Sequence, residues 1–345
     1  MTDQLLIPPH EKVKAKCSYF GTCGGCAFQD LDYSVQLELK KRQVEEALSI
    51  FNFYHSFTVN PTLPSPKPYY YRHMVAMTVK RRQDQLQFGF TGHDRRTFLA
   101  IESCPIADER INQFLPEALK KLEAMPPERK FHTSQVVLRI GDDGEVVTSL
   151  RIDRGRKLDC KVFEKSFSYS MSSFFQNNFS ILESFVETVR SFLKPEYQGT
   201  LFDLYSGVGF FGILLADSYK QVIGIEEGYE AVQLAVRNAK QNEINNISFS
   251  EGKVETLLPE LISKAVKPLH VIVDPPRVGL KPEVIQCLIK LPIDKLIYVS
   301  CELTALRRDL ELLQERFTIT KVQPLDLFPQ TKHVETIVLL QPKNS

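Results

Sequence analysis

Apolar and polar residues alternate most regularly in the second half of the chain. Leu201 to Tyr205 is a short apolar run with one acid, and it breaks at Ser206-Gly207-Val208-Gly209 before a second apolar segment starts at Phe210. This pattern predicts a buried strand, a tight glycine turn and the start of a helix. The glycines permit positive φ angles and a close approach of a ligand to the backbone, as in nucleotide-binding sheets. A plain buried strand before a glycine turn would give a similar pattern.

The same alternation predicts further elements downstream. The expected helix is Tyr229 to Gln241, and the expected strands are Gln221 to Ile225, Ile247 to Ser250, His270 to Val273, Lys295 to Ser300 and Ile337 to Leu340. Glu226 lies 17 residues after Gly209, about where an acid that binds ribose hydroxyls is found in such sheets. We therefore predict a doubly wound α/β sheet that binds a ribose-bearing ligand near Gly207 and Glu226.

Reactive side chains follow the predicted strands. Asp274 precedes two prolines, which stop a strand and start a rigid loop at the edge where α/β sheets bind ligands. Cys301 follows the next strand, where a stabilised thiolate could act as a nucleophile, although most lone cysteines are inert core residues. His333 and Glu335 precede the last strand. Either could be a surface residue, but a carboxylate close to Cys301 would complete a pair of nucleophile and base.

The first half of the chain predicts a different architecture. Leu31 to Ile50 has apolar residues at helical spacing and is expected to form one amphipathic helix. Short alternating runs then predict an antiparallel sheet with a helix over Ala107 to Leu122 on one face. Its expected strands are Met74 to Arg81, Gln85 to Phe90, Phe98 to Ile101, Gln135 to Ile140 and Glu145 to Arg151.

Three of the seven cysteines lie in one short glycine-rich loop. Cys17, Cys23 and Cys26 could converge on a metal, with Cys104, which is followed by a proline, as the fourth ligand. Four cysteines suit zinc and an iron-sulfur cluster equally well, and free thiols are the third possibility. Cys160 and Cys287 have no such context, and we expect them to be structural.

Two aromatic residues and three amides follow one another at Phe174, Phe175, Gln176, Asn177 and Asn178. Rings stack on planar groups and amides pair with base edges, so this segment could recognise a nucleotide. A buried aromatic pair that leads into a helix over Phe179 to Leu193 explains the pattern equally well.

Composition, length and charge indicate the general class of protein. The chain is 43% hydrophobic and 25% charged, which is typical of globular proteins. Its length of 345 residues predicts two or three domains. No apolar run reaches about 18 residues and no signal peptide is evident, so we expect a cytoplasmic protein without a membrane association and without disulfides. The net charge of +1 does not indicate a nucleic-acid partner by itself. Local basic clusters could each face solvent or phosphate: Lys40-Lys41-Arg42, Lys80-Arg81-Arg82, Arg95-Arg96 and Arg151/Arg154/Arg156/Lys157.

Taken together, these segments resemble a known family. The ordered motifs FFQNN, DLYSGVGFFG, GIE, DPPRVGL, YVSC and FPQTKHVE are similar to those of the uridine C5 RNA methyltransferases, and the four cysteines resemble the iron-sulfur branch of that family. The resemblance implies a Rossmann-like S-adenosylmethionine-dependent methyltransferase domain behind an antiparallel α+β domain. It also implies a [4Fe-4S] cluster on Cys17, Cys23, Cys26 and Cys104. Only 16 residues precede Cys17, so we expect a short form without an N-terminal RNA-binding barrel, as in the 23S ribosomal RNA enzymes.

The resemblance also implies domain limits and partners. We expect a cysteine-rich loop and helix over residues 1–48, a central antiparallel domain over 49–168 that faces RNA, and the methyltransferase domain over 169–345. The expected partner is RNA, with ribosomal RNA as the first candidate and tRNA as the second. The protein is expected to be a monomer.

Roles for single residues follow from the matching motifs. The resemblance implies Cys301 as the nucleophile and Glu335 as the base that removes a proton. It implies methyl-donor contacts at Gln176, Tyr205 and Glu226, and a contact to the donor or the base at Asp274. The chain departs from the family pattern at Phe210, at Lys253 and at Glu302-Leu303, where many relatives have Asn-Pro after the nucleophile.

Three other functions share part of this pattern. A cytosine C5 methyltransferase usually has a second cysteine beside the proline motif, and Asp274-Pro275-Pro276 has none. An adenine N-methyltransferase would not need Cys301. A redox or RNA-binding protein built on the cluster would need neither Cys301 nor a methyl donor.

Overall fold

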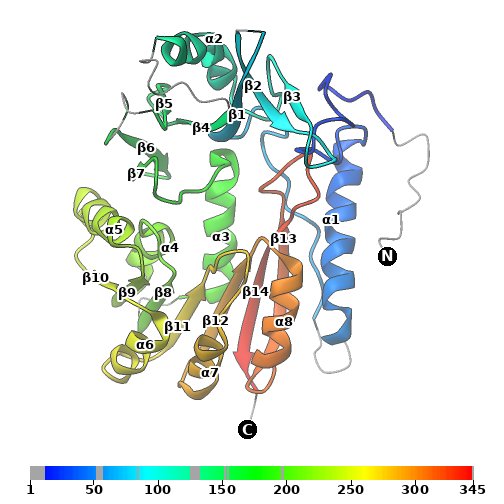
Figure 1. The fold of residues 1–345 in the computed structure, drawn as a ribbon. Helices are drawn as coiled ribbons and strands as arrows, with labels where there is room; N and C mark the ends of the chain where they lie inside the picture. Colours follow the sequence, from blue (N-terminus) through cyan, green and yellow to red (C-terminus); the bar gives the residue numbers. More distant parts are fainter. Residues whose placement is uncertain are drawn as a thin grey trace.

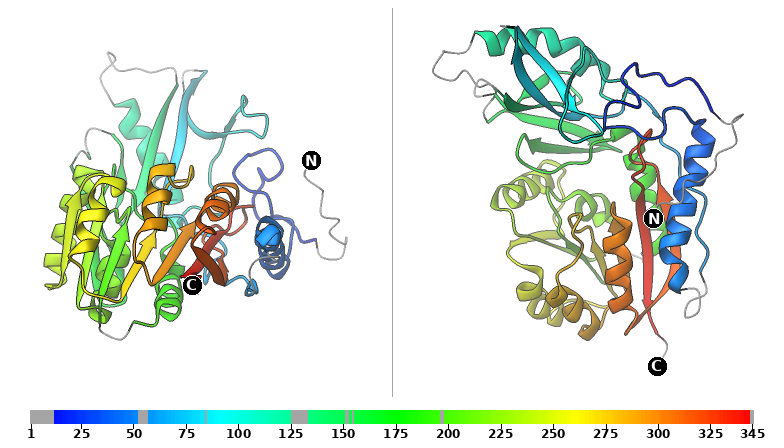
Figure 2. Two further views of the ribbon diagram at one scale, coloured as in Figure 1. Left: turned by 90° about the horizontal axis from the view of Figure 1, so that it is seen from below. Right: turned by 45° about the vertical axis from the view of Figure 1, so that its right-hand side comes forward.

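Three β-sheets organise the chain in the computed structural model, which describes residues 12–51, 57–83, 85–124, 133–150, 153, 155–195 and 198–343. In Figure 1, a five-stranded sheet and helix α2 lie at the top, a hairpin of β6 and β7 lies below them, and a seven-stranded sheet occupies the lower half. Helix α1 runs along one side of the large sheet, next to β13 and α8, in both views that show it from the side (Figures 1 and 2).

The seven-stranded sheet has the predicted doubly wound form. Its strand order is β10-β9-β8-β11-β12-β14-β13, in which the first five strands are parallel and β14 runs antiparallel to both of its neighbours, β12 and β13. This order places the ends of β9, β8, β11 and β12 at one edge. The strands are β8 (Thr200–Leu204), β9 (Gln221–Glu226), β10 (Ile247–Glu251), β11 (Leu269–Val273), β12 (Lys295–Ser300), β13 (Phe317–Leu325) and β14 (Glu335–Pro342).

Helices cover both faces of this sheet because its central strands are apolar on both sides. One face packs against α3 (Leu182–Leu193), α4 (Phe210–Leu215) and α5 (Tyr229–Gln241). The other packs against α1 (Tyr33–Leu48), α6 (Val254–Ser263), α7 (Pro282–Lys290) and α8 (Leu303–Leu313). Within the part of the chain that is described, no helix is both long enough and apolar enough to cross a membrane.

The five-stranded sheet is antiparallel, as predicted, with the order β3-β2-β1-β4-β5. Its strands are β1 (Met74–Arg82), β2 (Gln85–Thr91), β3 (Phe98–Ala100), β4 (Thr133–Ile140) and β5 (Val146–Thr148), and α2 (Glu109–Glu123) packs on its apolar face. The hairpin of β6 (Lys157–Val162) and β7 (Lys165–Ser170) packs instead into the core around α3 and α5.

Several predicted boundaries needed correction. The helix expected over Phe179 to Leu193 begins with a 3-10 turn, η5 (Phe179–Ile181), and becomes α-helical at Leu182. A second 3-10 turn, η2 (Ser49–Phe51), ends the first helix, and η6 (Ala216–Ser218) follows α4. The strand expected over Glu145 to Arg151 is shorter in the structure, where β5 spans Val146–Thr148. Arg151 and Arg154 lie outside the described residues.

The residues of the basic cluster at positions 40–42 do not all lie at the surface. Lys40 is fully buried, and its Nζ donates a hydrogen bond to the Asp326 carboxylate at 2.5 Å and to the Phe328 carbonyl at 3.0 Å. The prediction that this lysine faces solvent or phosphate is therefore wrong. Burial lowers the pKa of the Lys40 ammonium, and the charge of Asp326 opposes that shift. The ion pair joins α1 to the segment between β13 and β14.

Candidate active site

The turn after β8 forms the first part of the site. Tyr205, Gly207 and Gly209 all have positive φ angles, of 62°, 54° and 86°. A side chain at Gly209 would place its Cβ 2.8 Å from the ring of Phe249, so only glycine fits there. At Gly207 an added Cβ would meet nothing within 4 Å, which leaves space beside the backbone where a ligand can lie.

Glu226 closes the same turn from the neighbouring strand. It is the last residue of β9, and its carboxylate accepts hydrogen bonds from the N–H groups of Gly207 at 3.0 Å and Gly228 at 2.8 Å. Each carboxylate oxygen has a further lone pair. Glu226 can therefore stay bound to the turn and still accept a hydrogen bond from a ribose hydroxyl.

Asp203, the one acid within the apolar run of β8, holds the start of α4 by a hydrogen bond. It is 1% exposed, and its carboxylate accepts a hydrogen bond from the Gly212 N–H in α4 at 2.8 Å. Burial raises the pKa of this carboxyl to about 7. Asp203 therefore ties the glycine turn to its strand and does not face the ligand space.

Three adjacent strands bring the reactive groups together. Asp274 follows β11, Cys301 follows β12, and Glu335 is the first residue of β14. Ser300 and Thr336 form the last pair between β12 and β14, and Cys301 and Glu335 are the next residues beyond it, close enough for the charge of Glu335 to act on the Cys301 thiol. We had expected Glu335 in a loop, but it begins a strand and is 4% exposed.

Alternation along these strands also places the three side chains on one face of the sheet. Ile272, Ile297, Val299 and Ile337 all belong to the core beneath α3, α4 and α5. Asp274, Cys301 and Glu335 lie two residues from Ile272, Val299 and Ile337, respectively. All three therefore point to the face that also carries the turn at the start of α4.

Burial raises the pKa of all three groups. Burial, and then the charge of Glu335, raise the pKa of the Cys301 thiol to about 11, while Arg277 opposes the shift. Burial raises the pKa of Asp274 to about 7. Burial and repulsion by Asp274 raise the pKa of Glu335 well above its usual value. A carboxylate with a raised pKa is a stronger base, and this site holds two beside one thiol.

Cys301 is partly exposed at this edge of the sheet. It is one of the residues that border a groove of about 510 Å³, together with residues of α1 and α8, Lys332 and His333. Burial and the charges of Arg277 and Lys332 lower the pKa of His333, which favours its neutral form. Sequence reasoning did not single out Arg277 or Lys332, although both belong to motifs that carried the family resemblance.

The aromatic and amide segment divides into structural and exposed residues. Phe175 is buried and stacks on Tyr169 with ring centroids 4.7 Å apart. Asn177 accepts a hydrogen bond from the Met74 N–H at 2.6 Å, and Asn178 donates one to the Leu327 carbonyl at 3.2 Å. These residues join parts of the fold, so the structural interpretation holds for them. Phe174 is 70% exposed and is free to stack on a ligand.

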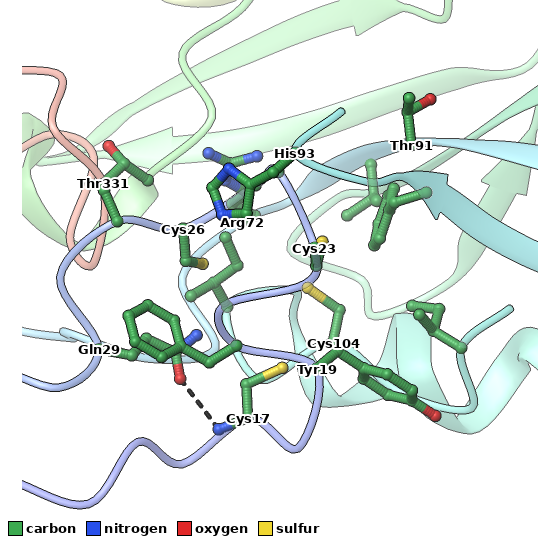
Figure 3. A pocket seen from close by; sticks show the side chains of 18 of the residues that line it. Cys17, Tyr19, Cys23, Cys26, Gln29, Arg72, Thr91, His93, Cys104 and Thr331 are labelled. Carbon is green, nitrogen blue, oxygen red and sulfur yellow. Dashed lines mark hydrogen bonds between the residues drawn. The ribbon is translucent and has the colours of Figure 1, made fainter. Parts of the chain in front are cut away.

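Four cysteines from two distant segments line one cavity of about 680 Å³. Figure 3 shows the side chains of Cys17, Cys23, Cys26 and Cys104 around the same space. The Gln29 amide oxygen holds the loop by accepting a hydrogen bond from the Cys17 N–H at 2.9 Å. Among the described residues, no group of three or more His, Cys, Asp and Glu side chains has an arrangement that could hold a metal ion. The predicted metal centre thus gains no support from this geometry.

The chain is similar to known RNA methyltransferases. Residues 156–343 match the family described as tRNA (uracil-5-)-methyltransferase. An uncharacterized RNA methyltransferase of Aquifex aeolicus is 32% identical over 99% of this chain and 87% of its own length. Another, from Synechocystis sp., is 30% identical over 99% of this chain and 85% of its own length.

The fold also has a solved counterpart. The crystal structure of the Pyrococcus abyssi tRNA (uracil-54, C5)-methyltransferase in complex with S-adenosyl-L-homocysteine superposes with a TM-score of 0.71. It covers 92% of this chain and 86% of its own at 24% identity, which supports the α/β methyltransferase fold. The protein is an S-adenosylmethionine-dependent RNA methyltransferase, and the chain belongs to the tRNA (uracil-5-)-methyltransferase family.

Proposed function

We propose that this enzyme methylates carbon 5 of a uridine in RNA through a covalent adduct between Cys301 and carbon 6 of the base. The observation that carries the proposal is the meeting of Asp274, Cys301 and Glu335 on one face of three adjacent strands. The donor turn at Gly207 lies at the same edge. In this proposal Cys301 is the nucleophile, Glu335 is the base, and the turn at Gly207 binds the methyl donor.

The chemistry explains why all three are needed. Carbon 5 of uracil is a weak nucleophile, so the Cys301 thiolate first adds to carbon 6 and the electron pair of the 5,6 double bond moves into an enolate. Carbon 5 then takes the methyl group from S-adenosylmethionine, and S-adenosylhomocysteine leaves. Glu335 removes the proton from carbon 5, the double bond re-forms, and the carbon–sulfur bond breaks to release the thiolate.

The residues present also fit the methyl donor. Glu226 has free lone pairs for the ribose hydroxyls, and the space beside Gly207 admits a ligand. Tyr205, at its positive φ, and Gln176, which is 9% exposed, are the further donor contacts in this proposal. Asp274 contacts the donor or the uracil ring.

The target uridine has to leave any helix, because carbon 6 of a stacked and paired base is out of reach of the Cys301 thiolate. A flipped or unpaired base could stack on exposed Phe174. We propose 23S ribosomal RNA as the substrate, on the resemblance of the motifs and cysteines. Transfer RNA is the second candidate, since the matching family and the Pyrococcus abyssi enzyme are both named for tRNA.

A [4Fe-4S] cluster on Cys17, Cys23, Cys26 and Cys104 is part of the proposal. Its support is the resemblance of the four cysteines to those of the iron-sulfur branch of the family. The cluster would organise the cysteine loop and has no step in methyl transfer. Protein purified without oxygen should be brown and contain iron and sulfide in about equal amounts. Zinc bound in stoichiometric amounts without iron would contradict this assignment.

Tritium release tests the reaction class. RNA that carries tritium at carbon 5 of its uridines should lose tritium to water in step with methyl incorporation, since substitution at carbon 5 displaces that hydrogen. Cys301→Ala should abolish both. Methyl incorporation without tritium release would place the methyl group elsewhere, and RNA from cells that lack the gene would identify the substrate by the missing 5-methyluridine.

A further inference from the structure

The segment between β13 and β14, residues 326–334, leads directly into Glu335. Gln330 lies at its centre, 1% exposed, with a positive φ of 68°. A non-glycine residue in this backbone conformation persists only where its surroundings hold it. Such residues gather at functional sites, and this one lies five positions before the proposed base.

Every polar group of Gln330 has a partner. Its N–H donates to the Gln36 side-chain oxygen at 3.1 Å, and its own side-chain oxygen accepts from the Gln36 amide at 3.1 Å. Its side-chain amide donates to the Pro68 carbonyl at 3.2 Å. Its carbonyl accepts from the N–H groups of Ala27 at 2.9 Å and Phe28 at 3.0 Å. One residue thus joins the segment to three other parts of the chain.

These partners connect distant regions to the catalytic edge. Ala27 and Phe28 directly follow Cys26 in the cysteine loop, Gln36 belongs to α1, and Pro68 precedes the first strand of the central sheet. A further hydrogen bond holds the neighbouring residue, Pro329, to the segment before β1. The Tyr71 hydroxyl donates to the Pro329 carbonyl at 2.9 Å. These hydrogen bonds hold the centre of the segment from the side of the cysteine loop, while the Asn178 amide holds its start at the Leu327 carbonyl.

We infer that Gln330 is a positioning residue that holds residues 326–334 against α1 and the cysteine loop, so that Glu335 starts β14 opposite Cys301. The inference rests on the proposed function, because it assigns Glu335 the removal of the proton from carbon 5. The cysteine loop then has a structural effect on catalysis through backbone hydrogen bonds, independent of any redox step. Loss of the Gln330 bonds displaces the base but leaves the donor turn and the thiol in place.

Gln330→Gly is the direct test, because glycine accepts the positive φ and removes only the side-chain bonds. We expect kcat to fall about 10- to 100-fold, since a displacement of a reacting group by about 1 Å costs on the order of 100-fold. The affinity for S-adenosylmethionine should stay within about twofold, because the donor turn shares no partner with Gln330. Methylated RNA bound to Cys301 should accumulate on a denaturing gel, since elimination is the step that needs Glu335.

Gln36→Leu removes the main partner from the side of α1 and should reproduce this pattern if Gln330→Gly folds poorly. Gln323→Ala is the matched control. Gln323 is also a buried glutamine before the same segment, and its amide donates to the Pro61 and Pro324 carbonyls at 2.7 and 2.9 Å. It should destabilise the fold to a similar degree without accumulation of the adduct.

The outcomes distinguish the positioning role of Gln330 from the proposed covalent mechanism. If Glu335→Gln gives a Cys301-dependent adduct while Gln330→Gly and Gln36→Leu turn over like Gln323→Ala, the positioning role is wrong and the proposed function stands. If no variant, Glu335→Gln included, ever yields an adduct, the proposed mechanism itself is wrong. If Gln330→Gly weakens donor binding as much as it lowers kcat, Gln330 acts on the fold in general and the inference is also wrong.

Discussion

The charge of Glu335 should control the acidity of the Cys301 thiol. Glu335→Gln removes a negative charge on the neighbouring strand and keeps the size of the side chain. Since a nearby negative charge disfavours the thiolate, its removal should lower the pKa of Cys301 from its raised value of about 11. At a fixed pH below that value, the variant should contain more thiolate than the wild-type enzyme.

The register sets the size of this effect. Facing residues of an antiparallel pair have Cα atoms about 5 Å apart, which puts the two charges at about 6 Å. With an effective dielectric constant of about 20, their repulsion is about 2.8 kcal/mol. Cys301 is partly exposed, and screening by solvent reduces this to about half. About 1.4 kcal/mol corresponds to one pKa unit, or a tenfold change in thiolate.

Alkylation by iodoacetamide measures the thiolate directly. The rate at Cys301, followed by mass spectrometry of its peptide from pH 7 upward, should rise with pH in both proteins, and at each pH below the wild-type midpoint it should be about tenfold higher in Glu335→Gln, whose midpoint is about one unit lower. Glu302→Gln is the matched control. Glu302 is next to Cys301 in the chain, but its carboxylate caps α8 by accepting a hydrogen bond from the Thr304 N–H.

The midpoint should move much less in Glu302→Gln than in Glu335→Gln. An unchanged or higher midpoint in Glu335→Gln would refute the facing arrangement of Cys301 and Glu335. An equal shift in the two variants would show that the effect depends on net charge and not on the strand register.

Three further predictions concern the donor site and the fold. Glu226→Ala should weaken S-adenosylmethionine binding by about 1 to 3 kcal/mol, the range for hydrogen bonds to a charged group, and calorimetry that shows unchanged affinity would make Glu226 a surface charge only. Gly209→Ala should lower both the midpoint of thermal unfolding and donor affinity, because its Cβ would meet Phe249 at 2.8 Å at a positive φ; an alanine variant with wild-type stability would contradict that contact. Lys40→Met leaves the Asp326 carboxylate buried without its partner and should cost about 3 to 5 kcal/mol in the free energy of unfolding by urea, whereas a loss below about 1 kcal/mol would indicate a solvated pair.

The sequence predicted the large sheet well because its local signals agree with one another. The apolar runs, the glycine turn at Gly207 and Gly209, and the prolines after Asp274 each act within a few residues. The start of α4 and the boundaries of α5 and β12 match the predicted segments. The strands β6 and β7 were not predicted although β6 alternates strictly between exposed and buried positions, because each has only six residues and their packing against the core around α3 is a tertiary effect.

The site was harder to predict, because its chemistry depends on pairing between distant strands. Glu335 appeared to lie in a loop, since four polar or turn-forming residues precede it; the pairing with β12 makes it the start of a strand. Lys40 was expected at the surface because it lies in a basic cluster, but it is buried against Asp326, a residue far away in the chain. Gln330 belonged to a visible motif, but its hydrogen bonds join four segments that only the fold brings together.

The central claim is that Cys301 forms a bond to the target base that only Glu335 can release. Labelled RNA, S-adenosylmethionine and each variant are mixed and run on a denaturing gel. We predict a slow-migrating, methylated adduct for Glu335→Gln and none for Cys301→Ala. Normal turnover of Glu335→Gln without an adduct, or methylation by Cys301→Ala, would contradict the account.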